Sequence, residues 1–555
     1  MKSGPKKLRA LDLYSGVGGW SLGLRLAGID VVASYEKWGP ANETNFKNNL
    51  HQAQTVDIRR LSLADLPKKI DIVVGSPPCT QFSFSNRGGG GDIEDGLEDI
   101  IRFLTIVDHL KPRFWVMENV PRVAGIMESE FQRGGALFKF RHLVCKTHIV
   151  NMADYGLPQR RQRCIAGNFN FGLLESYRSS QPQRTLGDVI SALNKNPVVD
   201  PLFGVTILQD ALVDHIQEDF LDAEEVRINK ANKTTHTVYN GMPFPDSLTR
   251  TVRTITAVCT RVSRESILIE APEAKGSYRR LTIRERASLQ GFPVTFQFYG
   301  STFNQKIRMV GNAVPPAFAY LVGQALRGVA AKKIIPLTAA AKKLVAPSPL
   351  PVETPPDRAG RTYPSNRTFR FAIPSLQLKS GVRFELKNEF VRDVAKWRIS
   401  FYFGTSKDIQ SIPLDEGLER RLNRQLTEPV SGEVKPHLDK LKAFVLNADV
   451  ANMQVLWAHK GVGQTRAFML LDAIDEAGSN ITRRLADHAG LARSLVERAL
   501  LHGKDNRYED LPGSAKLARN APLILAGLII GSAVNGMLEA HARNYADIRP
   551  RLAAR

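Results

Sequence analysis

Cysteine is scarce in this chain of 555 residues: its four cysteines are widely spaced and form no CxxC pair. Structural zinc sites and disulfide-stapled scaffolds need closely spaced cysteines, so we expect no metal site. A signal peptide is also lacking at the start of the sequence, because 1–9 contains no apolar run. Both absences predict a cytoplasmic protein, and a chain of this length buries large cores without covalent staples.

Long apolar runs are almost absent as well. The most apolar stretch, 521–538, is interrupted by a proline, three glycines, a serine and an asparagine. It is also short for a membrane span. We favour a buried helix there, with a membrane segment as the alternative, and expect no membrane partner.

Acidic residues are the minority charge, with 55 Asp and Glu against 76 Lys and Arg, a net charge of +21. The excess is shared between residues 1–330, at +9, and residues 331–555, at +12. A basic excess in both parts is typical of proteins that bind a polyanion. Many basic proteins bind no nucleic acid, so charge alone leaves the question open.

The first part of the chain alternates between predicted strands and helices, which indicates a parallel sheet. The expected strands are short apolar runs at 8–14, 31–35, 70–75 and 114–117, and the expected helices lie at 20–27 and 94–109.

Beyond residue 170 the pattern changes. Residues 170–277 are polar and irregular, and helical patterns follow at 278–290 and 310–325. A segment rich in Pro, Ala, Lys and Thr is typical of a linker. After it, strand-like stretches give way to a mostly helical pattern from 413 onward; the stretches lie at 369–373, 382–386 and 397–403.

A glycine-rich turn, DLYSGVGG at 12–19, follows the first predicted strand and precedes a helix. Glycines let the backbone approach a ligand closely. The dinucleotide pattern GxGxxG fails because Ser21 occupies its third position, so a nucleoside without a pyrophosphate fits better. Glu36, at the end of the second strand, is suited to ribose hydroxyls, and Asp57 to an adenine amino group. The alternative is a plain strand–turn–helix.

Three further motifs carry chemistry. GSPPCTQFS at 75–83 stiffens a loop with two prolines and presents Cys79 at the carboxyl end of a strand, where ligands bind in open parallel sheets. The other three cysteines are expected to be inert. ENV at 118–120 places Glu118 on the same sheet edge. A thiolate and a carboxylic acid suit attack on an unsaturated ring with protonation of its nitrogen.

QRRQR at 159–163 is a basic run, for which a solvated surface is the usual interpretation. Beside Cys79 and Glu118, its Arg161 and Arg163 are candidates for binding a base carbonyl or a phosphate.

In this order, the motifs resemble those of the DNA (cytosine-5)-methyltransferase family. The resemblance continues with RRLTIRERASLQGFP at 279–293 and GNAVPPAFA at 311–319, and it covers about residues 11–326. It implies S-adenosylmethionine as the cofactor. The family positions that line the cofactor site are matched here by Tyr14, Gly16, Gly18, Glu36, Asp57, Asn312 and Val314.

The resemblance also implies catalytic roles. Cys79 matches the nucleophile that adds to C6 of cytosine, and Glu118 the residue that holds the base edge and assists protonation at N3. Arg161 and Arg163 match the arginines that support Glu118 and the base carbonyl. Because the target ring is unreachable in a stacked duplex, the base is flipped out.

Two departures from the family pattern concern the aromatic residues at the cofactor site. Tyr14 stands where Phe is more usual. An aromatic residue commonly follows the acidic residue at once, but here Lys37 follows Glu36 and Trp38 comes next. Which side chain stacks on the adenine is left open between Tyr14 and Trp38.

The region that the family uses to read DNA sequence corresponds to about 171–277. It is dense in Thr, Ser and Arg after 254, and such side chains contact phosphates and base edges. A polar β-hairpin is the alternative. Our candidates for DNA contact are Arg250, Arg253, Arg261 and Arg264.

Residues 368–555 lie outside the resemblance. The stretch 481–500 has helix-turn-helix spacing, in which Gly490 would make the turn and Asn480 would cap the first helix. Arg493 and Arg498 would then lie on the recognition helix and bind DNA; plain helical packing is the alternative. A nuclease metal site at Asp357 and 385–387 is disfavoured, because Asp357 lies in the linker.

The sequence thus predicts an α/β protein with a Rossmann-like methyltransferase sheet, a smaller target-recognition domain and a mostly helical, α+β C-terminal domain. The expected divisions are a catalytic domain at 1–170, a target-recognition domain at 171–277, the rest of the catalytic unit at 278–330, a linker at 331–367 and an accessory domain at 368–555.

The predicted activity is transfer of a methyl group to C5 of cytosine in double-stranded DNA, in a restriction-modification or related bacterial or phage system. We expect a monomer on DNA, with a cognate restriction endonuclease as a further partner. The rival predictions are an RNA cytosine-5 methyltransferase and a DNA-binding regulator with a vestigial methylase half.

Overall fold

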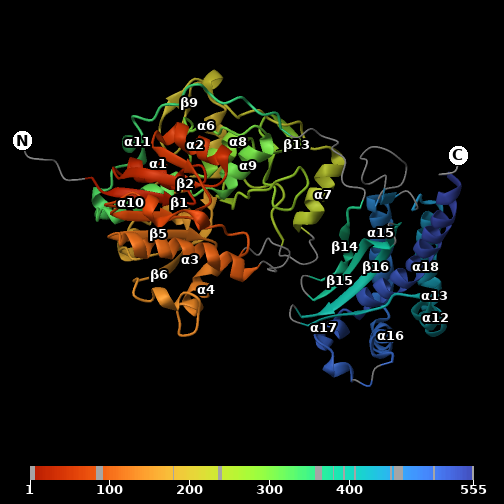
Figure 1. Cartoon of the computed structure of the whole chain (residues 1–555). Helices are drawn as coiled ribbons and strands as arrows, with labels where there is room; N and C mark the ends of the chain where they lie inside the picture. Colours follow the sequence, from red (N-terminus) through yellow and green to blue (C-terminus); the bar gives the residue numbers. More distant parts are fainter. Residues whose placement is uncertain are drawn as a thin grey trace, which may run out of the picture. The chain divides into compact units, whose positions relative to one another are not determined.

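The computed structural model describes residues 7–82, 92–178, 181–234, 241–356, 366–378, 381–391, 394–405, 408–450, 453–454, 467–503, 505 and 507–552, without the side chains of 467 and 542–552. The chain forms two compact units (Figure 1). Unit 1 comprises Met1–Asp222 and Pro245–Asp357, and unit 2 comprises Ala223–Phe244 and Arg358–Arg555.

Unit 1 is built on a seven-stranded sheet in the order β3-β2-β1-β4-β5-β8-β6. The first five strands in this order pair in parallel, whereas β8 is antiparallel to both β5 and β6. The strands are β1 (Arg9–Leu13), β2 (Asp30–Glu36), β3 (Gln52–Thr55), β4 (Ile72–Gly75), β5 (Phe114–Asn119), β6 (Lys146–Asn151) and β8 (Gln162–Gly167). The predicted parallel sheet is confirmed.

Helices cover both faces of this sheet. Alternate residues of β4 show why: Val73 packs into the core that contains α3, and Val74 packs into the core that contains α1 and α10. The strands are therefore buried on both sides, as apolar parallel strands are. The helices of this part are α1 (Gly19–Leu26), α2 (Gly39–Asn49), α3 (Ile93–Leu110), α4 (Arg122–Glu130), α9 (Phe303–Asn312) and α10 (Pro316–Leu326).

Two predicted helices differ from the structure. The pattern at 278–290 is divided between the end of β13 (Ala274–Arg280) and α8 (Ile283–Leu289), because Thr282 caps α8 in a capping box with Glu285. The pattern at 310–325 is divided between α9 and α10, because the Pro315–Pro316 pair begins a new helix.

Residues 171–277 do not form a compact unit of their own. Most of the segment belongs to unit 1, and only the part around α7 (Ala223–Thr234) belongs to unit 2. Its other elements are short: α5 (Phe171–Glu175), α6 (Leu186–Leu193), β9 (Val198–Val199), β10 (Thr206–Ile207), β11 (Val252–Arg253) and β12 (Leu268–Ala271). β11 pairs with β7 (Gln159–Arg160), and β12 pairs with β13.

Much of the predicted linker is packed onto unit 1. Leu337, in α11 (Leu337–Ala340), is buried in the core of α1 and α10. The Val352 carbonyl accepts a hydrogen bond from Lys306, and Glu353 accepts one from the backbone N–H of Asp214. This stretch resembles a linker because it is rich in Pro and Ala, but its few apolar side chains pack onto unit 1.

Unit 2 contains a four-stranded antiparallel sheet in the order β14-β15-β16-β17. The strands are β14 (Arg370–Gln377), β15 (Val382–Val391), β16 (Val394–Gly404) and β17 (Ile409–Ile412). Three of them confirm the strands expected after 368. The helices that follow are α12 (Glu416–Gln425), α13 (Val430–Asn447), α15 (Ala467–Ala486), α16 (Ala489–Leu501), α17 (Ser514–Arg519) and α18 (Ala521–Leu552).

The apolar stretch at 521–538 lies in α18, which packs against β16, α15 and α16. Among the described residues α18 is the one helix long and apolar enough to cross a membrane, and 78% of its window Ala521–His541 is buried inside the structure. The expected buried helix is confirmed.

The predicted helix-turn-helix is corrected in two places. Gly490 lies inside α16 rather than in a turn, and Asn480 lies inside α15 rather than at its start. The turn is instead at 487–488. The spacing of apolar residues showed that helices are present, but it carries little information about where one helix ends.

Candidate functional site

The glycine-rich turn after β1 carries three residues with positive φ: Tyr14 at 52°, Gly16 at 52° and Gly18 at 86°. The backbone N–H of Gly16 donates to Oε2 of Glu36 at 3.0 Å. The Trp38 N–H donates to the other oxygen of the same carboxylate at 2.8 Å. The turn and the end of β2 are thereby joined at the carboxyl edge of the sheet.

The turn is pressed against the segment between α9 and α10. A Cβ placed on Gly19 would lie 1.9 Å from the carbonyl oxygen of Val314. Val314 is buried, whereas Asn312 is exposed. Two motifs about 300 residues apart in sequence therefore meet, as the predicted cofactor site requires.

Asp57 caps a short helix after β3, where its carboxylate accepts from the N–H of Arg59 at 3.1 Å. Arg59 in turn binds both carboxylate oxygens of Asp99 on α3, at 3.0 and 2.7 Å. The Tyr14 hydroxyl lies 3.2 Å from Asp99 Oδ1, and burial beside this carboxylate raises the pKa of Tyr14. An ion-pair network thus links the glycine-rich turn, the short helix after β3, and α3 around the predicted nucleoside site.

These groups fit the cofactor that the resemblance implies. A Cβ on Gly16 would meet nothing within 4 Å, so the space beside the turn is open to a ligand. Among the described residues, the Glu36 carboxylate accepts hydrogen bonds from backbone N–H groups. These bonds suit replacement by hydrogen bonds from the ribose hydroxyls of the cofactor. Of the two aromatic candidates, Tyr14 is tied to Asp99, and Trp38 has the Arg308 guanidinium 4.9 Å from its ring centre.

The start of the loop that carries Cys79 is fixed by three hydrogen bonds. Ser76 accepts a hydrogen bond from the Trp20 indole N–H at 3.0 Å, and its own N–H donates to the Leu13 carbonyl at 3.2 Å. The Asn119 amide donates to the Pro77 carbonyl at 3.0 Å. The sulfur is thus held at the carboxyl end of β4, and Ser83, at the end of the motif, lies outside the described residues.

Glu118, at the end of β5, lies beside this loop with 8% of its side chain exposed. Nε of Arg163 on β8 is 2.9 Å from Glu118 Oε1, an ion pair without the alignment of a hydrogen bond. The hydrogen-bonding capacity of Oε1 is therefore unfilled among the described residues.

Arg161, which was expected together with Arg163 to support Glu118 and the base carbonyl, is hydrogen-bonded to the backbone. Its fully buried guanidinium donates to three backbone carbonyls, those of Gly311 at 3.3 Å, Ala313 at 3.1 Å and Ile255 at 3.5 Å. Its Nε–H is buried without an acceptor in the described part of the chain. Burial lowers the pKa of Arg161 to about 9, so the group stays charged at neutral pH.

Electrostatic interactions place Cys79, Glu118, Arg161 and Arg163 in one cluster. Burial raises the pKa of the Cys79 thiol, and the Glu118 carboxylate raises it further, while the two arginines lower it. The net effect is a pKa above the ordinary value for cysteine. At neutral pH the resting group is a thiol.

The four candidate DNA contacts in 171–277 separate into two groups. Arg261 is 5% exposed and donates to the carbonyls of Asp219 and Phe220, both at 3.0 Å. Arg253 pairs with the buried Asp246. These two hold the segment together, which conflicts with DNA contact. Arg250 is exposed and Arg264 half-buried, and both stay candidates.

In unit 2, Arg493 and Arg498 are exposed on α16. Arg493 is paired with Glu497 at 2.9 Å, one helical turn away. The predicted nuclease site finds no support: Glu385 is fully buried in ion pairs with Arg370 and Arg383, and Asp357 lies outside the described residues. No group of three metal-ligating side chains occurs in the part of the chain that the structure describes.

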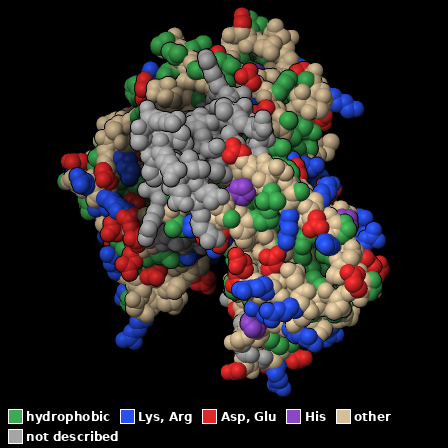
Figure 2. Space-filling view, turned by 90° about the vertical axis from the view of Figure 1, so that its right-hand side faces the viewer, with side chains coloured by type: hydrophobic (Ala, Val, Ile, Leu, Met, Phe, Trp, Pro, Cys, Tyr) green, Lys and Arg blue, Asp and Glu red, His purple; other side chains and the backbone are tan. Residues whose placement is uncertain are grey.

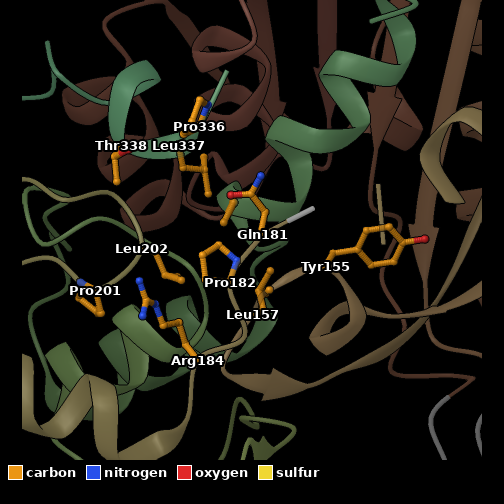
Figure 3. Close-up of a pocket in the computed structure, with 12 residues that line it drawn as sticks. Tyr155, Leu157, Gln181, Pro182, Arg184, Pro201, Leu202, Pro336, Leu337 and Thr338 are labelled. Atoms are coloured by element: carbon orange, nitrogen blue, oxygen red, sulfur yellow. The ribbon is translucent and has the colours of Figure 1, made fainter. Parts of the chain in front are cut away.

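A separate cavity in unit 1 contains none of the predicted site residues. It has a volume of about 110 Å³ and lies between the turn at 155–157, the segment 181–184 and α11. Figure 3 shows Pro182, Leu202 and Leu337 around it, while the Tyr155 hydroxyl points away. Half of the twelve lining residues are proline or leucine, and none belongs to the predicted catalytic cluster.

Several residues that hold the site escaped the sequence analysis. Trp20 and Asn119 fix the loop of Cys79, and Arg59 and Asp99 connect the elements around the predicted cofactor site. Asn119 could have been found, since it stands inside the ENV motif. Asp95 and Asp99, one turn apart on α3, also form an acidic pair that signals a basic partner.

Comparison with known proteins gives a consistent result. The family model for C-5 cytosine-specific DNA methylase matches residues 8–328. The chain is 29% identical over 344 residues to the Type II methyltransferase M1.HphI of Haemophilus parahaemolyticus, which covers 58% of this chain and 86% of that protein. It is 28% identical over 330 residues to M.FnuDI of Fusobacterium nucleatum, covering 58% and 94%.

Among solved structures, a DNA modification methyltransferase encoded within an Escherichia coli prophage is similar, with 21% identity, a TM-score of 0.43, and coverage of 58% of this chain and 99% of that one. The Dnmt2 methyltransferase of S. pombe is similar with 20% identity and a TM-score of 0.38 over 58% of this chain and 99% of that one.

Proposed function

The chain belongs to the C-5 cytosine-specific DNA methylase family, and from this premise we propose how its own residues carry out the reaction. The enzyme is an S-adenosylmethionine-dependent DNA (cytosine-5)-methyltransferase. We assign the cofactor site to the turn at 14–18, Glu36, Asp57 and the segment 312–314. The bound cofactor supplies a methyl group from its sulfonium centre.

In the proposed mechanism, the target cytosine is flipped out of the duplex to meet Cys79. The Cys79 thiol first loses its proton to solvent. The resulting thiolate forms a bond to C6, and the electron pair of the C5–C6 double bond moves toward C5. Glu118 holds the base edge and assists protonation of N3. C5 takes the methyl group, a base removes the C5 proton, and the C6–S bond breaks to restore the double bond and release the thiolate.

The observation that carries this proposal is a pair of unfilled polar atoms beside Cys79. Oε1 of Glu118 and the Nε–H of Arg161 are both buried without a hydrogen-bond partner among the described residues. Buried unsatisfied groups are costly and mark functional positions. An acceptor and a donor so placed match the amino edge and the carbonyl of cytosine.

Trapping on 5-fluorocytosine tests the nucleophile, because fluorine at C5 blocks loss of the C5 substituent. We expect the full chain with cofactor to form a denaturation-resistant adduct with a duplex containing this base, and Cys79→Ser to form none. Cys145→Ser is the matched control and should trap DNA as the native chain does. Trapping or methylation by Cys79→Ser would show that the assignment of the nucleophile is wrong.

We also propose that the enzyme acts in a Type II restriction-modification setting in the cytoplasm, as a monomer on duplex DNA and with a cognate endonuclease. The names of its relatives support the Type II setting. Bisulfite sequencing of DNA from a methylation-free host that expresses the chain would give its target site. Methyl transfer to tRNA but not to duplex DNA would favour the RNA methyltransferase instead.

DNA binding by residues 368–555 belongs to the same proposal, but α16 is a weak candidate for it. Its apolar side is used for packing on α18, and its Arg493 is already paired. The expected turn at Gly490 is absent from the structure of this region.

A further inference from the structure

The sheet of unit 2 has one apolar face and one charged face. Phe384, Leu386, Ile399 and Phe401 alternate along β15 and β16 and are fully or almost fully buried. α15 and α18 cover this apolar face. The residues between them in sequence point to the opposite face, which we call the outer face.

The outer face is strongly basic. It carries five cations and two carboxylates from β14, β15 and β16; these are Arg370, Arg383, Lys387, Lys396 and Arg398, with Glu385 and Glu389. Figure 2 shows one side of the molecule, on which basic and acidic side chains are interspersed.

Three of the cations stand directly opposite one another. Arg370 pairs in register with Lys387, and Lys387 pairs with Arg398, so a basic row crosses three neighbouring strands. Adjacent strands are about 4.8 Å apart. Like charges directly opposite each other destabilise a sheet. The repulsion within such a row must be offset by negative charge nearby.

The two carboxylates hold four of the cations in place and neutralise them only in part. The fully buried Glu385 accepts from Arg370 at 2.6 Å and from Arg383 at 2.7 Å. Glu389 contacts Lys387 at 2.6 Å and Arg398 at 2.9 Å. Each carboxylate is shared by two cations, so positive charge remains, and the side chains are held in place before any partner arrives.

An aromatic ring lies among these cations. The ring centre of Tyr402 is 4.8 Å from the Arg383 guanidinium, 5.9 Å from that of Arg370 and 5.8 Å from the Lys387 ammonium. Its faces hold cations and are not open for stacking a base. This arrangement suits the regular phosphates of a duplex better than the unstacked bases of a single strand.

We propose that the outer face of the β14–β17 sheet binds the phosphate backbone of duplex DNA and anchors the enzyme to its substrate outside the catalytic unit. The inference takes duplex DNA as the partner from the proposed function. It assigns the contact to the sheet and not to α16.

The test is duplex binding by the full chain, measured by fluorescence anisotropy as a function of salt. The variant Lys387→Gln, Lys396→Gln, Arg398→Gln spares the buried Glu385. Each lost phosphate contact lowers the slope of log affinity against log salt by about 1, so the triple variant should lose about 2 to 3. Its weakening should be equal for target and unrelated duplexes.

The matched control removes the same charge from the helical side of unit 2, where three exposed cations lie on α12 and α13: Arg420→Gln, Arg424→Gln, Lys435→Gln. Equal weakening by the control would show that net charge alone binds DNA and would overturn the proposal. So would an unchanged salt slope in the outer-face variant, or loss of RNA binding with duplex binding retained.

Two measurements distinguish a variant that is misfolded or otherwise damaged from one that has lost its DNA contacts. Circular dichroism and thermal unfolding verify that the variant is folded, and Arg398→Lys, which keeps the charge, should bind duplex as the native chain does. The binding assay needs no methyl transfer. Inactivity of the native chain would therefore refute the proposed function and leave the outer face to be decided by anisotropy.

Discussion

Gly19 is the point where the cofactor turn meets the segment before α10, and Gly19→Ala should disrupt both. The added Cβ would lie 1.9 Å from the Val314 carbonyl oxygen, whereas real Cβ atoms essentially never come closer than 3.0 Å. The obstacle is backbone, so Val314 must recede by at least 1.1 Å. The neighbouring Ala313 carbonyl accepts from Arg161 at 3.1 Å and from Gln290 at 2.8 Å, and both hydrogen bonds would stretch beyond reach.

The expected cost combines overpacking, about 1–3 kcal/mol, with two lost hydrogen bonds of about 1 kcal/mol each. We therefore expect destabilisation of about 3–5 kcal/mol, which corresponds to a fall of about 4–7 °C in the unfolding temperature of a unit as large as unit 1. Calorimetry would measure the unfolding temperature, and titration would measure the affinity for S-adenosylmethionine, which should fall as well.

Gly125→Ala is the matched control for this change. Gly125 lies inside α4, where a Cβ would meet nothing within 4 Å, so alanine should stabilise by about 0.5–1 kcal/mol. If Gly19→Ala unfolds within 1 °C of the native chain and binds the cofactor equally well, the contact between the turn and Val314 stabilises neither the fold nor the cofactor site.

Four further predictions concern the site and unit 2. Glu118→Gln removes a charge that raises the Cys79 pKa, so alkylation of Cys79 by iodoacetamide at pH 8 should become faster. Methylation should fall about 10²-fold or more. Slower alkylation would contradict the effect of Glu118 on the Cys79 pKa. In the native chain the rate of that alkylation should rise steadily from pH 7 to 9, since the thiolate fraction grows up to the raised pKa, and a plateau at pH 7 would refute it. Arg59→Gln should raise KM for S-adenosylmethionine about tenfold with little change in kcat, whereas the exposed-pair control Lys440→Gln should change neither. Gly490→Ala should stabilise unit 2 by about 0.5–1 kcal/mol in denaturant unfolding, and destabilisation would restore a turn at that position.

The central strands of unit 1 could be predicted because they are buried on both faces. β1, β4 and β5 are apolar runs, and each was expected close to its observed bounds. β3 and β6 were missed because they are the outermost strands of the sheet and are rich in polar residues, QAQT and KTHIVN. A strand at the edge has less core to fill, so its sequence carries no apolar run.

The chemistry of the site was accessible from short motifs, but its supports were not. Cys79 and Glu118 were found because each stands at or just after the end of an apolar strand, and Arg163 because it lies in the basic run QRRQR at 159–163. Trp20 and Arg59 act on partners 56 and 40 residues away, through contacts that depend on the folded topology. The backbone carbonyls that bind Arg161 cannot be predicted from a pattern of side chains.

The limits of sequence patterns also explain the revision of the chain's divisions. α7 lies inside the segment that the resemblance assigns to DNA reading, yet it packs against β14 in unit 2. Arg227 on α7 pairs with Asp472 and lies 4.8 Å from the ring centre of Phe468. Phe468 in turn packs on Phe371 of β14. Residues 368–555 are consequently incomplete as a compact unit without 223–244, an insertion that comes from the segment proposed to read DNA.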